Sequence, residues 1–118
     1  MSEIWLPVPG YEGLYIISNR GQVKSLDRPG HPGRVLRPQE NSLGYGRVTL
    51  SRDNVKRRLF VHRLVAEVFL PRIPGCDVVN HLDFDKSNNA ASNLEWTTQK
   101  GNVQWSLAAG RYRKGAMA

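Results

Sequence analysis

Cysteine is almost absent from this sequence and long apolar runs are missing, and both facts narrow the class of protein. One cysteine, Cys76, among 118 residues excludes an internal disulfide and a zinc site built from several cysteines. No stretch approaches the roughly 18 to 20 consecutive apolar residues of a membrane-spanning helix. Residues 1–10 start acidic and lack the basic region and apolar run of a secretory signal. We therefore expect a soluble, cytoplasmic protein with no membrane partner.

Acidic residues are the other scarce group. The chain has 17 lysines and arginines against 10 aspartates and glutamates, which gives a net charge of +7 and a pI near 10.1. Such a surplus attracts polyanions, of which nucleic acid is the commonest. Residues 1–75 hold 12 basic and 6 acidic residues, whereas residues 76–118 hold 5 and 4. We expect the first part of the chain to contact a nucleic-acid backbone and the later part to be more neutral.

The first half of the chain has the pattern of short strands separated by turns. In residues 47–50 apolar and polar side chains alternate, so that one face of this strand is apolar and the other polar. We predict that the polar face of the sheet carries the arginines Arg34, Arg37, Arg47, Arg57 and Arg58. The expected strands are residues 14–18, 21–26, 34–38, 45–51 and 56–61.

After these strands the apolar spacing changes to that of a helix. Residues 62–70 carry apolar side chains on one stripe, and Pro71 ends the helix. Two further strands are expected at 77–80 and 93–98, joined by a long polar loop. A last helix over 99–109 and a frayed basic tail over 111–118 complete the expected elements.

Residues that can support hydrolytic chemistry gather in this C-terminal part. His81 follows Asn80 at the end of a strand, Asn93 begins the next strand, and Asn102 lies on the expected last helix. A histidine with a pKa near 6.5 can accept a proton at neutral pH. Amide oxygens suit a hard cation such as Mg²⁺, which keeps several waters and needs few protein ligands. Asparagine also offers donors and an acceptor, which suits bracing an irregular loop.

These segments resemble a known family. The sequence VNHLDFDKSNNAASNLEWTTQKGN resembles the HNH endonuclease motif of phage and homing nucleases, and VHRLVAEVFLP resembles the helix that precedes it there. The stretch IWLPVPGYEGLYIISNRGQVKSL resembles the nuclease-associated modular domain that is often fused in front. The resemblance covers roughly residues 3–110. It implies a metal-dependent endonuclease that cuts DNA, derived from a phage or mobile element and acting in the host cytoplasm.

The resemblance also implies roles for individual residues. His81 matches the general base that deprotonates the attacking water, and Asn93 matches the asparagine that braces the loop and orients this histidine. Asn80 and Asn102 match the metal ligands. The implied cofactor is one divalent ion, Mg²⁺ for preference, with Mn²⁺ as a substitute. The implied partner is double-stranded DNA, bound by a monomer or a homodimer.

The implied fold is α+β, with a small N-terminal antiparallel β module, a connecting helix and a ββα-metal (HNH) unit. We predict a modular β region over 1–61, the catalytic unit with its preceding helix over 62–110, and a flexible tail over 111–118. The residues expected to contact DNA are Arg34, Arg37, Arg47, Arg57, Arg58, Arg63 and Lys86.

Three positions depart from the family pattern, and two of them, Asn80 and Trp105, keep another interpretation open. Asn80 stands where some members have aspartate, Trp105 where many have histidine, and Phe84 where glycine is common. A neutral amide holds a cation less firmly than a carboxylate does, so a DNA-binding protein with a decayed nuclease site is one alternative. An RNA-binding or RNA-cutting protein is another, although the sequence has no aromatic-rich RNA-recognition strand. His62 opens the helix beside apolar residues, which favours packing or capping over catalysis.

Overall fold

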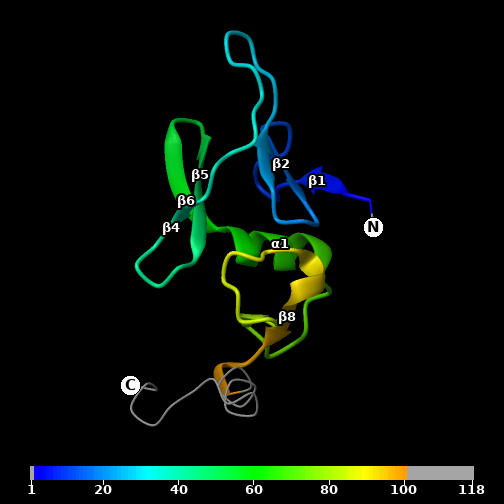
Figure 1. Cartoon of the computed structure of the whole chain (residues 1–118). Helices are drawn as coiled ribbons and strands as arrows, with labels where there is room; N and C mark the ends of the chain where they lie inside the picture. The colour runs from blue at the N-terminus through cyan, green and yellow to red at the C-terminus, as the bar shows by residue number, and fades with distance from the viewer. Residues whose placement is uncertain (1, 101–118) are drawn as a thin grey trace.

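The computed structural model describes residues 2–100, and its elements are arranged around a single helix (Figure 1). Figure 1 shows this helix, α1, between the N-terminal strands β1 and β2 on one side and β8 on the other. Of the last predicted helix only residues 99–100 are described, and its remainder, the tail, Asn102 and Trp105 lie outside the described residues. The described part contains three small antiparallel sheets and one α-helix, which confirms the α+β class.

The first sheet is a three-stranded meander in the order β1–β2–β3, formed by Trp5–Pro7, Tyr15–Ser18 and Val23–Ser25. In β2 the residues that alternate inward are Tyr15 and Ile17, which are 6% and 0% exposed. Strand β1 was not predicted from the sequence, because it is three residues long and mostly exposed, which leaves little alternation to detect.

The segment 34–38 is not the strand that we predicted. It runs extended beside β3, where Leu36 donates its N–H to the carbonyl of Val23, but only Val35 forms an isolated bridge, with Lys24. Pro38 has no backbone N–H, so the ladder cannot continue through it. The strand of this region is β4, only two residues long (Gln39–Glu40).

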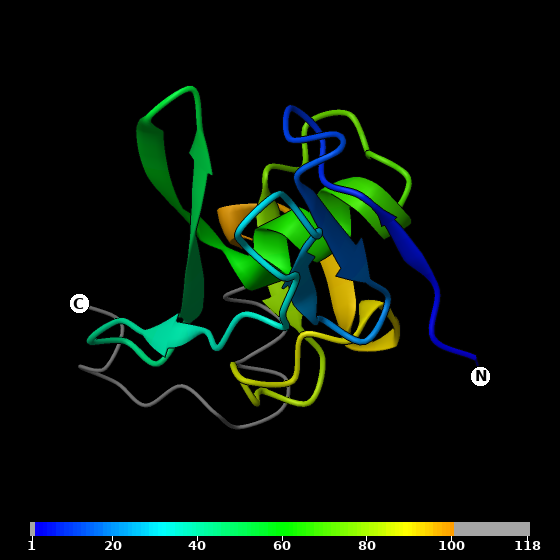
Figure 2. The ribbon, with the colours of Figure 1, turned by 90° about the horizontal axis from the view of Figure 1, so that it is seen from above.

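The second sheet, in the order β4–β5–β6, is dominated by the hairpin of β5 (Gly46–Arg52) and β6 (Val55–Phe60). This hairpin projects from the body of the molecule (Figure 2). Val48 and Leu50 of β5 are buried, at 3% and 0% exposed, which confirms the predicted alternation. Most of β6 is exposed, so the hairpin contacts the core mainly through one strand.

The register of the hairpin corrects one prediction. Thr49 pairs with Arg58 and Leu50 pairs with Arg57, and directly opposed residues share a face of the sheet. Arg47 lies two residues before Thr49 and therefore shares the face of Arg58, whereas Arg57 lies on the other face. The prediction of one face carrying both Arg57 and Arg58 is wrong, because neighbouring residues of a strand point to opposite sides.

Helix α1 (Val61–Phe69) packs the sheets together. Its buried face consists of Val61, Leu64, Val65 and Ala66. Leu70 ends the helix in an extended conformation, as expected for the residue before Pro71. One cluster of buried apolar side chains runs from the first sheet through β5 and α1 to the third sheet.

The third sheet pairs β7 (Val78–His81) with β8 (Leu94–Thr97), and the chain between them forms a long loop that ends in the 3₁₀ turn η1 (Ala91–Asn93). Val79 and Trp96 are directly paired and both are buried, at 8% and 5% exposed. Their apolar face holds the two strands against the core, and the loop therefore begins and ends at fixed points.

The β5–β6 turn offers a test of the hairpin. Asp53 and Asn54 have φ of 52° and 63°, which is the conformation of a type I′ turn. Asn54→Gly is expected to raise the free energy of unfolding by up to about 1 kcal/mol, because glycine adopts positive φ without a Cβ clash. Asn54→Val is expected to lower it by about 1–2 kcal/mol. Equal urea midpoints for all three proteins would contradict this turn.

Candidate active site

His81 is the last residue of β7 and is only 5% exposed. Its neighbour Asn80 is equally buried, and because strand residues alternate, the two side chains point to opposite sides of the two-stranded sheet. The ladder with β8 fixes both, since Asn80 pairs with Glu95 and His81 with Leu94. The strand end thus presents a buried imidazole on one side and a buried amide on the other.

One hydrogen bond sets the protonation pattern of this imidazole. His81 Nε2 lies 2.8 Å from Asn89 Oδ1, and both side chains are buried. An amide oxygen only accepts, so Nε2 must carry the proton and Nδ1 of a neutral ring is left as the basic nitrogen. Sequence reasoning did not assign this role to Asn89. The loop contains several asparagines, and their spacing does not indicate which one turns inward.

Asn93 braces the loop that carries Asn89. Its Oδ1 accepts the backbone N–H of Asp83 at 3.1 Å, and its Nδ2 donates to Asp83 Oδ1 and to the carbonyl of Asn88, both at 2.9 Å. One side chain therefore closes the loop at three points. The Asn88 side chain also donates to Asp83, and this bond is the main reason why the pKa of Asp83 lies below its usual value. Asp83 is thus a structural carboxylate of the loop in this structure.

Phe84, where the family often has glycine, has a φ of 64°. This left-handed conformation costs a residue with a Cβ free energy that glycine would not lose. The loop therefore keeps the glycine backbone geometry although the side chain differs.

A group of aromatic and imidazole rings lies beside the buried ring of His81. His62, the second residue of α1, has its ring centroid 5.1 Å from that of His81, and Tyr45 lies 5.1 Å from His62 and 5.9 Å from His81. Phe60 completes the group, 5.4 Å from His62. No side chain forms a capping hydrogen bond at the start of α1. Of the two roles expected for His62, packing against neighbouring side chains therefore fits its position, and capping of the helix does not.

His62 is a neutral ring at physiological pH. Burial, then the nearby His81 and Arg63, lower the pKa of His62 from 6.5 to about 4. Its Nδ1 is buried and has no hydrogen-bond partner among residues 2–100. Protonation of His62 would place a positive charge beside that of Arg63 and next to the ring of His81.

On the opposite side of the strand, Asn80 has an amide oxygen that could bind a cation. Its Nδ2 donates a hydrogen bond to Glu95 Oε1 at 3.1 Å, which fixes the orientation of the amide. The amide oxygen, Oδ1, is then the atom that could coordinate a cation. An amide oxygen beside a carboxylate fits a hard divalent ion. Within residues 2–100 no three His, Cys, Asp or Glu side chains gather as a metal site. The second predicted ligand, Asn102, lies outside the described residues.

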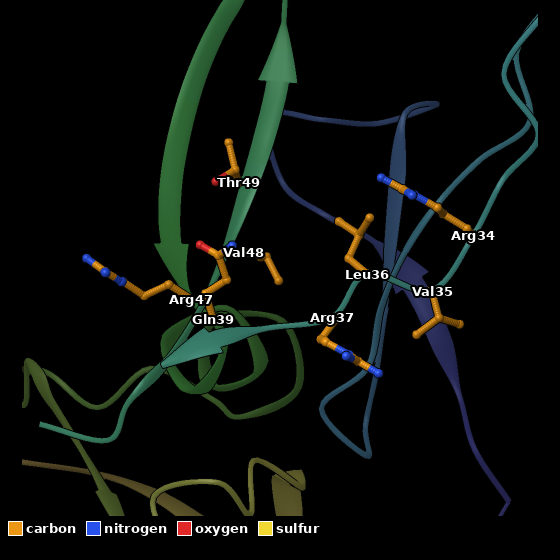
Figure 3. A pocket seen from close by; sticks show the side chains of 8 residues that line it. All are labelled: Arg34, Val35, Leu36, Arg37, Gln39, Arg47, Val48 and Thr49. Carbon is orange, nitrogen blue, oxygen red and sulfur yellow. The ribbon is translucent and has the colours of Figure 1, made fainter. Parts of the chain in front are cut away.

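The predicted DNA-contact residues fall into three groups. Arg34, Arg37 and Arg47 line a shallow groove of about 310 Å³, shared with Gln39 and Thr49. Figure 3 shows Arg34 and Arg37 on the extended segment before β4, while the Arg47 side chain extends from β5 away from them. The Nε of Arg47 is buried without a hydrogen-bond partner in the described chain.

Arg57 and Arg58 lie exposed on the projecting hairpin. Arg63 and Lys86 differ because both already have partners. Arg63 pairs with Glu67 at 3.5 Å and lies over the Trp96 ring. Lys86 Nζ donates to the carbonyl of Leu43 at 2.8 Å and lies over the ring of Tyr45.

The described helix is not long and apolar enough to cross a membrane.

The strand–loop–strand unit with its buried histidine has counterparts among known families. Residues 59–104 match the family model of the HNH endonucleases, and residues 3–51 match that of the NUMOD4 motif. The chain belongs to the HNH endonuclease family, in the form that carries a NUMOD4 motif ahead of the HNH unit.

Particular relatives are phage and viral proteins. The chain is 39% identical over 106 residues to the DNA endonuclease I-HmuI of Bacillus phage SP01, which covers 90% of this chain and 59% of that protein. An HNH endonuclease of Acanthamoeba polyphaga mimivirus, L245, is 38% identical over 81% of this chain and 28% of its own length. The solved structure of I-HmuI superposes with a TM-score of 0.82 at 38% identity, over 93% of this chain and 61% of that one. The chain thus spans about three fifths of the length of I-HmuI and less than a third of the length of L245.

The buried His62 predicts a pH dependence of stability. Its pKa is about 4 in the folded chain and near 6.5 when unfolded, so the unfolded state binds more protons between these values. The contribution of the neutral ring is complete above pH 6.5 and is lost as the pH falls toward 4. In His62→Phe, urea unfolding at pH 7 and pH 4.5 is expected to show a smaller loss of stability than in the wild type. An equal loss of stability between pH 7 and pH 4.5 in both proteins would contradict a neutral His62 in the folded chain.

Proposed function

We propose that this chain is the catalytic part of a metal-dependent DNA endonuclease, in which His81 activates the attacking water. The observation that carries the proposal is the hydrogen bond between His81 Nε2 and Asn89 Oδ1, 2.8 Å long and buried. A ring fixed in this way leaves Nδ1 as the basic nitrogen at the end of β7. A catalytic base of this kind needs a pKa near the working pH and a fixed direction.

The hydrolytic step follows from this arrangement. Nδ1 of His81 takes a proton from water as the water oxygen bonds to the phosphorus. The bond from phosphorus to the 3′ oxygen breaks, and this oxygen leaves and takes a proton from the solvent. Asn89 holds the imidazolium that forms, because its carbonyl oxygen accepts the Nε2 proton in either charge state. Asn93 acts through the loop, which it closes at Asp83 and Asn88.

The cofactor of the proposal is one divalent ion, Mg²⁺ for preference, with Mn²⁺ as a substitute. Asn80 and Asn102 would hold it, and the carboxylate of Glu95 orients the amide of Asn80. When bound, such an ion neutralises charge on the phosphate and on the leaving oxygen. Mg²⁺ is a hard cation that prefers oxygen ligands, and the amide side chains of Asn80 and Asn102 provide such oxygens.

Double-stranded DNA is the proposed substrate. The relative I-HmuI is named as a DNA endonuclease, and the net charge of +7 lies mainly in the first part of this chain. Arg34, Arg37 and Arg47 at the groove and Arg57 and Arg58 on the hairpin are the proposed phosphate contacts. Arg63 and Lys86 are proposed to contact DNA beside the active site, where their present partners fix their positions.

One active site per chain cuts one strand at a time. A monomer therefore nicks DNA and a homodimer cuts both strands, and we propose that the reaction takes place in the cytoplasm of the phage host. Analytical ultracentrifugation with and without DNA distinguishes monomer from homodimer.

Cleavage of supercoiled plasmid tests the proposed function. Wild-type protein with Mg²⁺ or Mn²⁺ is expected to nick or linearise the plasmid, and EDTA is expected to abolish this. His81→Ala is expected to reduce the rate by about 10²- to 10⁴-fold, the range typical for a general base. His31→Ala is the matched control, because His31 is an exposed histidine of the loop before Arg34, and it should cut at the wild-type rate.

The outcomes separate the alternatives. DNA binding without cleavage under any metal would contradict the proposal and would identify a DNA-binding protein with a decayed site. Equal cleavage by wild type and His81→Ala would exclude His81 as the base. Preferential cleavage of RNA would refute the choice of DNA as substrate.

Salt dependence tests the basic groove. Each phosphate contact that is lost should reduce the slope of log K against log salt by about 0.9. Arg37→Ala and Arg47→Ala are each expected to reduce the slope by about this amount, with similar loss for all DNA sequences. Arg72→Ala is the control, because Arg72 pairs with Glu67 and Asp77 and is not one of the proposed phosphate contacts, so the slope should stay unchanged. Unchanged slopes for Arg37→Ala and Arg47→Ala would remove the groove from the DNA interface.

A further inference from the structure

The loop that carries Asn89 rests on a glycine of the N-terminal sheet. Gly21 lies in the turn between β2 and β3 and has a φ of 88°. A Cβ placed on Gly21 would lie 2.8 Å from the carbonyl oxygen of Asn89 and 2.9 Å from its carbonyl carbon and Cβ. Distances under 3.0 Å essentially never occur for real Cβ atoms, and the nearest atoms are backbone. The turn and the loop are therefore in direct contact, and only glycine fits between them.

A hydrogen bond joins the same two segments. The backbone N–H of Ala91 donates to the carbonyl of Asn19 at 2.8 Å, two residues from each member of the Gly21–Asn89 contact. On another side of the loop, Lys86 donates to the carbonyl of Leu43 at 2.8 Å. The loop between β7 and β8 is thus attached to two turns of the N-terminal part.

Conformation alone does not explain the glycine at position 21. Gly13, in the turn at the other end of β2, has a nearly equal φ of 80°, yet a Cβ there would meet nothing within 4 Å. Position 13 thus needs glycine for its backbone angle only. Position 21 needs it for the angle and also for the close approach of Asn89.

We propose that Gly21 is a positioning residue of the active site, which sets the place of Asn89 and through it the orientation of His81. The proposal rests on the proposed function, because it assigns to the NUMOD4 segment a part in the catalytic unit of the HNH segment. Gly21 lies within residues 3–51 and Asn89 within residues 59–104, the stretches matched by the two family models. The base of one unit is then held by a turn of the other, and the HNH segment alone lacks this support.

Gly21→Ala and Gly13→Ala form a matched pair for the test. Both place a Cβ on a left-handed residue of the same sheet, but only the first displaces Asn89. Gly21→Ala is expected to lower kcat for plasmid nicking by about 10- to 100-fold, since a displacement near 1 Å costs this much at a reacting centre, with KM for DNA little changed. Gly13→Ala is expected to keep kcat within about twofold of wild type.

Imidazole ¹⁵N NMR of the full chain gives a readout that does not depend on cleavage. In the wild type and in Gly13→Ala, neutral His81 should carry its proton on Nε2 in a single tautomer. In Gly21→Ala, a mixture of the two tautomers of neutral His81 is expected. Asn89→Ala should show the same mixture, and adding Gly21→Ala to it should cause no further loss of kcat.

Ala91→Pro is the second variant if Gly21→Ala does not fold. Ala91 opens the turn η1, and Ala90 before it has φ −64° and ψ 140°, which suits a residue that precedes proline. This change removes only the N–H that bonds to Asn19, and it should again disturb the tautomer of His81 and lower kcat several-fold.

The results for this proposal and for the proposed function are separable. A single Nε2 tautomer with wild-type kcat in both Gly21→Ala and Ala91→Pro would overturn the positioning role while leaving the nuclease intact. A disturbed tautomer in these variants, in a protein that cuts no nucleic acid with any metal, would support the positioning of His81 and overturn the proposed function.

Discussion

The buried hydrogen bond between His81 and Asn89 is the constraint on which the arrangement of this molecule depends. A buried imidazole nitrogen without a partner would cost free energy, and a ring free to turn would be a poor base. Asn89 meets both requirements at 2.8 Å. To place this one amide, the chain needs a loop braced by Asn93 at three points and strands β7 and β8 fixed at both of its ends.

The N-terminal part and the strand–loop–strand unit are joined through packing as well as through this loop. The buried apolar cluster is continuous from Ile17 of β2 through Val65 of α1 to Trp96 of β8. Helix α1 also carries His62 against His81, so the position of the helix affects both the core and the surroundings of the His81 ring. The boundary predicted near residue 61 therefore marks a change of pattern in the sequence, whereas the core and the candidate site include residues from both sides of it.

The alternation of side chains along the strands also determines which way the charged and polar side chains face. The hairpin register separates Arg57 from Arg58, so the basic residues of β5 and β6 face two directions instead of one. Arg63 lies over the ring of Trp96, and Lys86 lies over the ring of Tyr45. Asn80 and Glu95 on the far side of β7 and β8 present oxygen donors, away from the neutral rings around His81. The proposed base and the proposed cation ligand are thus neighbours on one strand that point to opposite sides, because successive residues alternate.

The sequence by itself determined the α+β class, the alternation in β5, the extent of α1 and the adjacency of Asn80 and His81, because each depends on local spacing or on a motif within one segment. The family resemblance, which the comparisons confirmed, rested on such motifs as well. Only the tertiary structure decided that Asn89, rather than Asn88, turns toward His81 and that His62 and Tyr45 lie beside it. It alone brought Gly21 under the loop, 68 positions earlier in the numbering than Asn89. Contacts of this kind depend on how separate segments pack, and local periodicity carries no information about such packing.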